Sequence, residues 1–167
     1  PEESPGEVIE LGDVTLAPGY VDVHNHGGGG AAFAQDPATA AALHRSPGTT
    51  SVVASLVTQS LDELDGQVRR LAPLVEAGDL AGIHLEGPYL APARKGVHNP
   101  DKFHTPSDAE LDRIASLDNG KTLLTLAPER FDDATLRALA ARGVLLSAGH
   151  TAAGYERLRA AFANGVR

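Results

Sequence analysis

The chain has 167 residues, of which 42% are hydrophobic, so it is long enough to fold as one ordinary globular domain with a buried core. Its formal net charge of −8 argues against non-specific nucleic-acid binding, which needs clustered Lys and Arg side chains. The lack of cysteine excludes disulfides, thiolate catalysis and cysteine-type zinc sites, so any metal has to be held by His and carboxylate side chains.

The sequence predicts neither a membrane-spanning segment nor a signal peptide at its start. No apolar stretch reaches the roughly 20 residues that span a bilayer. The acidic residues 1–10 lack the basic start of a signal peptide, so we expect a cytoplasmic protein with no membrane or nucleic-acid partner. Because the sequence starts without Met and stops directly after a helix-like segment, we expect both ends to lie inside a longer protein.

The first expected element is a strand or pair of strands near the start. Residues 7–16 alternate apolar and polar side chains, which predicts one or two antiparallel strands outside the main fold. We assign residues 1–17 to part of a small β domain and residues 18–167 to a larger α/β region.

Within the α/β region, expected strands and helices alternate. Short β-rich apolar runs predict the strands, and apolar residues at helical spacing predict the helices between them. In chain order the elements are strand 21–24, helix 37–45, strand 50–56, helix 61–77, strand 81–85, helix 107–116, strand 122–126, helix 132–142, strand 144–147 and helix 152–164. This order indicates parallel strands with right-handed crossovers, in either a doubly wound sheet or part of a (β/α)8 barrel.

A pair of histidines ends the first strand of this region. His24 and His26 are two residues apart in the run DVHNHG, so both imidazoles face the same side of the strand. They could share a metal ion, or be two solvent-facing histidines. The glycines at 27–30 could let backbone N–H groups approach an anion, or form a flexible turn.

A carboxylate ends the strand expected at 81–85. Glu86 is followed by Gly87 and Pro88, which stop the strand and expose the carboxylate. Barrel enzymes place their chemistry at such carboxyl ends of strands. Glu86 is therefore a candidate ligand, whereas His84, one pleat deeper, is a candidate structural or supporting histidine.

A third strand end offers another histidine. His150 follows the strand at 144–147 through the small residues Ala148 and Gly149. Three strand ends then offer His, Glu and His, a ligand set that zinc commonly takes, with an open position for a water whose pKa falls toward about 7. Zinc is the first candidate, and iron and manganese suit the same ligands.

The connection at 87–106 has neither helical nor strand periodicity and contains the basic run RKGVHNP at 94–100. A loop of this length in a compact domain is usually functional. The run could clamp an anionic group of a substrate, or be a solvated loop. His44 and His104 fit none of these patterns, and we interpret them as surface or capping residues.

Four segments together resemble the N-acetylglucosamine-6-phosphate deacetylase family of the amidohydrolase superfamily. They are PGYVDVHNHGG at 18–28, HLEGPYL at 84–90, KGVHNP at 95–100 and SAGHT at 147–151. The resemblance implies a (β/α)8 barrel beside a small β-sandwich. Of this fold, the chain would supply about five βα units in residues 18–167 and an N-terminal remnant of the sandwich in residues 1–17.

The resemblance also implies a reaction: metal-activated water hydrolyses the N-acetyl group of N-acetylglucosamine 6-phosphate, giving glucosamine 6-phosphate and acetate. It implies Glu86 and His150 as ligands of the main metal, and His24 and His26 as the second-metal pair of some members. One or two ions per site, most simply zinc, follow from it. It implies that Val97 and His98 contact the substrate.

Two functional groups of the family are expected beyond Arg167. These are a second ligand His and the Asp that acts as general base, so no catalytic residue is assigned within the chain. For the intact protein we expect a small-molecule amino-sugar phosphate as substrate and a homodimer as the assembly. The alternatives are another amidohydrolase, such as a cyclic amidase or deaminase, and an inactive metal-binding fragment.

Overall fold

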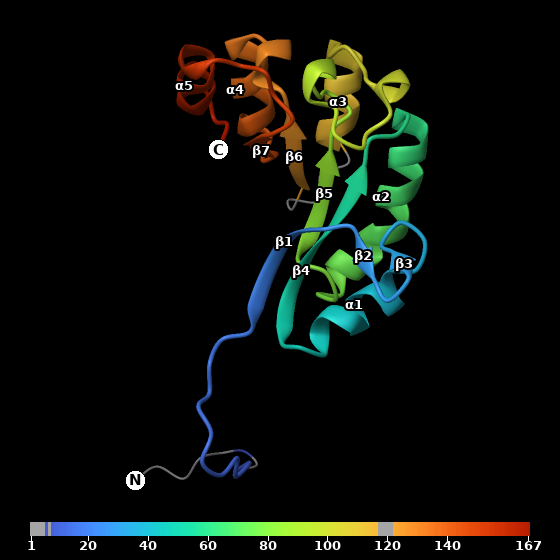
Figure 1. Ribbon diagram of the computed structural model, residues 1–167, viewed down its shortest axis with the longest axis vertical. Helices are drawn as coiled ribbons and strands as arrows, with labels where there is room; N and C mark the ends of the chain where they lie inside the picture. The colour runs from blue at the N-terminus through green and yellow to red at the C-terminus, as the bar shows by residue number, and fades with distance from the viewer. Residues whose placement is uncertain (1–5, 7, 117–121) are drawn as a thin grey trace.

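The computed structural model describes residues 6, 8–116 and 122–167. Its main feature is a five-stranded parallel sheet, whose order is the order of the chain. The strands are β1 (Tyr20–Asn25), β4 (Thr49–Val57), β5 (Gly82–Glu86), β6 (Thr122–Leu126) and β7 (Leu145–Ala148). A sheet without reversal of strand order is a curled half-barrel and not a doubly wound sheet, which settles the choice that the sequence left open (Figure 1).

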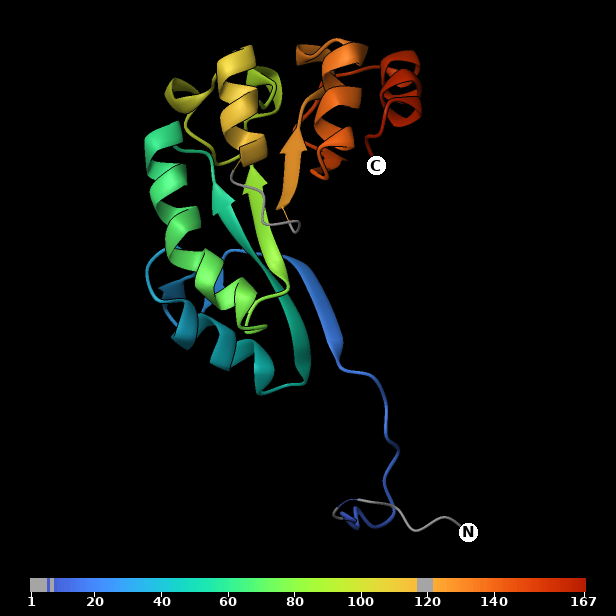
Figure 2. The same cartoon turned by 180° about the vertical axis from the view of Figure 1, so that it is seen from behind.

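Helices connect the successive strands and cover one side of the curled sheet (Figure 2). They are α1 (Pro37–Arg45), α2 (Leu61–Glu76), α3 (Asp108–Ser116), α4 (Asp133–Ala141) and α5 (Tyr155–Ala163). These five helices and the five strands of the parallel sheet all begin and end within three residues of the predicted bounds. The prediction of a partial barrel with about five βα units is therefore confirmed.

The core lies between the helices and the sheet. Along α2, every third or fourth side chain is buried, from Leu61 through Leu64 and Val68 to Leu71 and Val75. Such spacing places one apolar stripe of the helix against the strands. Each large aliphatic side chain that leaves water in this way contributes about 1.5–3 kcal/mol to folding.

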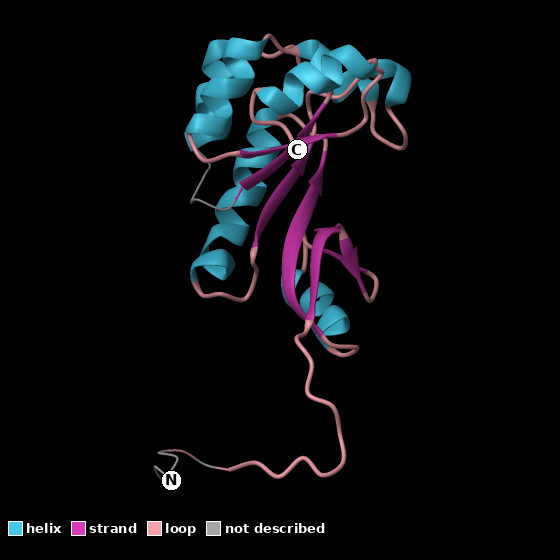
Figure 3. Ribbon diagram, turned by 90° about the vertical axis from the view of Figure 1, so that its left-hand side faces the viewer, coloured by secondary structure: helices cyan, strands magenta, loops and turns pink. Residues whose placement is uncertain are grey.

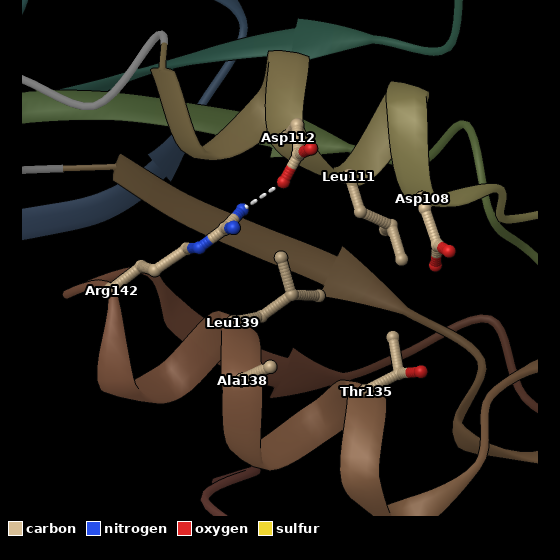
Figure 4. A pocket seen from close by; sticks show the side chains of 7 residues that line it. All are labelled: Asp108, Leu111, Asp112, Thr135, Ala138, Leu139 and Arg142. Carbon is tan, nitrogen blue, oxygen red and sulfur yellow. Dashed lines mark hydrogen bonds and ion pairs between the residues drawn. The ribbon is translucent and has the colours of Figure 1, made fainter.

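The outer helical layer also carries a shallow groove between α3 and α4 (Figure 4). Leu111 and Leu139 form its apolar part, and Arg142 donates to Asp112 across it with an N–O distance of 2.6 Å. Both charged side chains are about half exposed, so this ion pair adds little to stability.

The predicted N-terminal strands are not formed in the described residues 8–19. Val8, Ile9, Leu11, Val14 and Leu16 are all more than half exposed, and the segment extends away from the sheet (Figure 3). Alternating side chains define an apolar face, but a strand also needs a partner, and none is supplied by the described residues. Residue 7 lies outside the described residues, and the assignment of residues 1–17 to a β domain stays a prediction.

The glycine-rich segment after β1 forms a small antiparallel hairpin of β2 (Gly27–Gly28) and β3 (Ala31–Ala32). Gly27 has a φ of 146°, and a Cβ there would lie 2.2 Å from the Ala31 carbonyl oxygen. The run therefore permits close backbone pairing. Among the described residues, no helix has the length and apolar character needed to cross a membrane.

Candidate metal centre

The paired histidines lie at the carboxyl end of β1. Their Nε2 atoms are 3.2 Å apart, a distance at which the two nitrogens need a proton or a shared cation between them. Asp22 fixes this end of the strand, because its carboxylate accepts from the His24 backbone N–H and from the Asn25 side chain. The Asn25 side-chain oxygen in turn accepts from the Gly27 N–H at 2.9 Å, so the turn that carries His26 is held in place.

Glu86 ends β5 and is the centre of the cluster. Its side chain is only 7% exposed, yet four imidazoles converge on its carboxylate. The distances from Nε2 to the nearest Glu86 oxygen are 2.9 Å for His26, 3.0 Å for His150, 3.4 Å for His98 and 3.5 Å for His24. The structure therefore brings together five side chains from three strand ends and one loop.

The surroundings keep the Glu86 carboxylate ionised. Burial raises the pKa of its carboxyl, but the hydrogen bond from His26 and the electrostatic influence of the nearby His98 and His24 rings outweigh burial and lower that pKa to about 2. The same hydrogen bond to Glu86 raises the pKa of the His26 imidazole. The cluster therefore has a negative centre surrounded by imidazole nitrogens, an environment that favours a cation.

His150 directly follows β7 and Gly149. Its backbone has a φ of 49°, a left-handed conformation that is uncommon for a residue with a side chain. Its Nδ1 lies 2.7 Å from the Arg94 carbonyl oxygen, so Nδ1–H donates to that oxygen and the lone pair of Nε2 faces Glu86. A histidine that donates through one nitrogen to a carbonyl is oriented as metal-ligating histidines are.

His98 reaches the cluster from the loop at 87–106, with the opposite arrangement of its ring. The Thr58 backbone N–H donates to His98 Nδ1 at 3.4 Å, so the neutral ring carries its proton on Nε2, toward Glu86. Burial lowers the pKa of the His98 imidazole. His98 is thus arranged as a hydrogen-bond donor, while the neighbouring Val97 is 95% exposed and does not reach the carboxylate.

The donor set fits a divalent metal ion. Two groups of three residues, namely His24, His26 and Glu86, and Glu86, His98 and His150, have ligand atoms that all lie within 4.8 Å of one another. Imidazole nitrogens and a carboxylate are ligands of zinc, iron and manganese. Several of these atoms would repel one another if neither a proton nor a cation lay between them, so the geometry supports a cation at this place.

Known proteins that are similar in sequence to this chain are deacetylases of sugar phosphates. The N-acetylgalactosamine-6-phosphate deacetylase of Escherichia coli O157:H7 is 34% identical over 99% of this chain and 46% of its own length. The N-acetylglucosamine-6-phosphate deacetylase of Vibrio furnissii is 33% identical over 96% of this chain and 43% of its own length. No protein-family model matches the chain.

A solved structure of a deacetylase also matches the chain. N-acetyl-D-glucosamine-6-phosphate deacetylase from Mycobacterium smegmatis, as a variant in complex with N-acetyl-D-glucosamine-6-phosphate, superposes with a TM-score of 0.87 at 43% identity. The match covers 98% of this chain and 45% of that one. The chain is homologous to the N-acetylglucosamine-6-phosphate deacetylases. It spans less than half the length of the relatives that it matches.

Beneath the cluster of this deacetylase homologue lies a buried polar layer that the sequence only partly revealed. His84 is 1% exposed, and its two ring nitrogens lie 2.8 Å from Ser55 Oγ and 2.8 Å from Thr125 Oγ1. Burial lowers the pKa of His84 to about 4, so its ring is neutral. This agrees with the prediction of a structural histidine, and its ring packs edge-on against His24 with 4.7 Å between centroids.

The sequence analysis missed Ser55 and Thr125. The strand register could have pointed to them, because Ser55 pairs with His84 across β4 and β5, and Thr125 pairs with Glu86 across β5 and β6. His44 and His104 lie outside the cluster, as predicted. His44 contacts the Gly27 carbonyl oxygen at 3.1 Å, and His104 pairs with Glu110 at 2.8 Å.

Proposed function

We propose that, in the full-length protein, this chain forms part of an enzyme that hydrolyses the N-acetyl group of N-acetylglucosamine 6-phosphate. The products are glucosamine 6-phosphate and acetate. The observation that carries the proposal is the convergence of four imidazoles on one buried, ionised carboxylate at the carboxyl ends of barrel strands. The solved relative from Mycobacterium smegmatis, whose structure contains this sugar phosphate, supports the choice of substrate.

The ring orientation of His150 and the grouping of the other donors support a set of metal ligands. Glu86 and His150 would hold the main cation, because the His150 Nε2 lone pair faces the carboxylate. His24 and His26 would hold a second cation with the same carboxylate. A divalent metal, with zinc as the first choice, supplies Lewis acidity toward the acetyl carbonyl and lowers the pKa of a water.

His98 and Val97 are proposed to contact the substrate. Both line a hollow beside the cluster, together with Val57, Thr58, Gln59, Asn99 and Lys102. The Nε2–H of His98 faces the Glu86 carboxylate, so a sugar oxygen bound beside that carboxylate can share this donor. Lys102, which pairs with Glu63, adds a positive charge to the lining of the hollow.

A second candidate substrate is N-acetylgalactosamine 6-phosphate. Two relatives named for this activity, from Escherichia coli O157:H7 and a Shewanella strain, are 34% and 30% identical to the chain. The two substrates present the same amide and the same phosphate to the site. Competition between them in one assay, read as the ratio of kcat/KM values, distinguishes the two candidates.

The test of the metal proposal is Glu86→Gln, in a version extended to the length of the relatives. The amide keeps the shape but loses the charge, so we expect loss of bound metal and a fall in turnover beyond the roughly 10–100-fold typical of residues outside the ligand set. Glu156→Gln is the control, because Glu156 lies on α5 and pairs with Arg159 at the surface. Unchanged metal content and turnover in Glu86→Gln would reject the assignment.

The same assay separates the remaining alternatives. Turnover on a cyclic amide but not on either sugar phosphate would indicate another amidohydrolase. If both the 167-residue chain and the extended version bind metal but neither turns over a substrate, the protein binds metal and does not catalyse. The expected homodimer, the cytoplasmic location and the division at residue 17 stay predictions.

A further inference from the structure

The turn that follows β6 carries charge but no candidate ligand. This single 3-10 turn, η3 (Pro128–Arg130), makes hydrogen bonds both to the connection after β7, which contains His150, and to the loop that carries His98. Its two charged side chains, Glu129 and Arg130, each bind one of these neighbours. The turn is therefore a bridge between two loops of the proposed site.

Glu129 binds the residues directly after His150. Its Oε2 accepts from the Thr151 hydroxyl at 2.5 Å, and its Oε1 accepts from the Ala152 backbone N–H at 2.7 Å. The Thr151 hydroxyl oxygen accepts in turn from the Ala153 N–H at 2.9 Å. One carboxylate thus fixes the first two residues after the proposed ligand.

His150 needs such support because its backbone is left-handed. A φ of 49° is disfavoured for a residue with a Cβ unless its neighbours hold it there. The His150 carbonyl oxygen accepts from the Ala91 N–H at 2.9 Å. Glu129 in turn accepts from the Ala152 N–H, two residues after His150. Relaxation of this turn would move Nε2 away from its position 3.0 Å from Glu86.

Arg130 holds the other loop in the same region. Its guanidinium donates to the Leu90 carbonyl oxygen at 3.0 Å and to the His104 carbonyl oxygen at 2.7 Å. These two residues lie near the ends of the loop at 87–106, and this loop supplies the Arg94 carbonyl oxygen that accepts from His150 Nδ1. The ring of His150 is therefore oriented from the Arg94 side, and its backbone from the Glu129 side.

We propose that Glu129 is a positioning residue for His150: it holds the left-handed turn that aims Nε2 at the metal centre. The inference rests on the proposed role of His150 as a ligand. Glu129 itself is exposed. Its hydrogen bonds among the described residues go to Thr151 and Ala152, and none goes to His24, His26, Glu86 or His98. Its effect on metal binding should therefore pass entirely through His150.

The test measures Zn²⁺ affinity of the 167-residue chain by competition with a chelator, alongside thermal unfolding. The variants are Glu129→Ala, Glu129→Gln, His150→Ala and the Glu129→Ala/His150→Ala double variant. Glu156→Ala is the control, an exposed carboxylate that pairs only with Arg159 among the described residues. Thermal unfolding shows whether each variant still folds.

We expect Glu129→Ala to weaken Zn²⁺ binding by about 10–100-fold, as the loss of groups that orient ligands does. Glu129→Gln should retain part of the affinity, because its amide oxygen can still accept from Ala152 N–H. The double variant should bind Zn²⁺ as His150→Ala does, since an effect that passes through His150 disappears with it. The control should match the parent chain.

Two results would overturn the inference while leaving the metal proposal intact. One is an unchanged affinity in Glu129→Ala when His150→Ala is weakened. The other is a double variant weaker than His150→Ala by the full Glu129→Ala factor, which would mean that Glu129 acts independently of His150. An unchanged affinity in His150→Ala would overturn the ligand assignment and this inference together.

Discussion

Gly87 shows how closely the backbone packs around the proposed ligand Glu86. Its φ is 88°, and a Cβ at this position would lie 2.2 Å from Thr58 Oγ1. That hydroxyl donates to the Glu86 carbonyl oxygen at 2.8 Å, so the space is occupied by a group that holds the strand end. Only glycine satisfies both the conformation and the contact.

We therefore predict that Gly87→Ala lowers the free energy of unfolding by about 1–3 kcal/mol, the cost of a residue held in a disfavoured conformation plus the displaced hydroxyl. Denaturant unfolding of the two proteins measures the difference. Gly66→Ala, in the middle of α2, is the matched control, because its nearest neighbour would be Arg70 Nη1 at 3.8 Å. The control should stabilise by about 0.5–1 kcal/mol, and equal effects at both sites would contradict the argument.

The residues of the cluster were foreseeable to different degrees. His24, His26, Glu86 and His150 each end an apolar strand, and parallel strands bring such ends together, so the sequence was enough to group them. His98 could not be placed by this reasoning, because a loop carries it and no periodicity reports where a loop folds back. The roles of the ring nitrogens depended on two backbone contacts, Arg94 O and Thr58 N, which sequence does not encode locally.

At the scale of elements, α2 has the most complete start signal in the chain. The Ser60 hydroxyl accepts from Glu63 N–H, and the Glu63 carboxylate accepts from Ser60 N–H, which together form a capping box. Lys102, from the loop at 87–106, donates to the same carboxylate at 3.1 Å. The start of α2 and this loop are thus connected.

We predict that Ser60→Ala lowers the free energy of unfolding by about 0.5–2 kcal/mol, as the loss of an N-cap does. The hydrogen bond from the Ser60 side chain, followed by that from its backbone and by Lys102, lowers the pKa of Glu63 from 4.5 to about 2. A lowered carboxyl pKa adds stability that is present above pH 4.5 and is lost as the pH falls toward 2.

Ser60→Ala should therefore also reduce the loss of stability between pH 4.5 and 2, since the strongest cause of the shift is removed. Urea unfolding at several pH values measures both effects. Ser46→Ala is the control, because Ser46 is exposed at the end of α1 and its hydroxyl has no hydrogen bond to a described residue. If the parent and Ser60→Ala lose the same free energy of unfolding between pH 4.5 and 2, Ser60 does not cause the lowered pKa of Glu63.

The element boundaries that the sequence placed least well have specific causes. We expected a helix from residue 152, whereas α5 begins at Tyr155. Glu129, which is distant in sequence, binds Ala152 N–H, and Thr151 Oγ1 binds Ala153 N–H, so residues 151–153 stay outside the helix. The predicted N-terminal strands do not form in the described residues 8–19 for a related reason, because alternation specifies a face and pairing depends on a partner elsewhere.

At the scale of the whole molecule, the half-barrel has one open edge and one partly covered edge. β1 pairs only with β4 among the described residues, and its Tyr20, Val21 and Val23 side chains are 54–71% exposed. At the other edge, Arg167 exchanges hydrogen bonds with β7 through Leu146 O and Ala148 N. The β1 edge is therefore the place where another chain can add a strand.

We predict that the 167-residue chain self-associates through β1 when it is studied by itself. Light scattering over a concentration series should show a mass above that of the monomer, and Val21→Lys should reduce it, because an edge lysine opposes strand addition. Val97→Lys is the control, since Val97 is 95% exposed on the loop at 87–106 and is not part of β1. A monomer at all concentrations would contradict the prediction.

The strand order described above also sets a sequence in time. Because each strand of the sheet pairs with the one made just before it, a chain leaving the ribosome never has to wait for a later segment to complete the preceding pair. His24 and His26 are synthesised first, Glu86 joins them with β5, and His150 arrives last with the residues after β7. A nascent chain can therefore present its paired imidazoles to a metal well before His150, 64 positions after Glu86, has been translated.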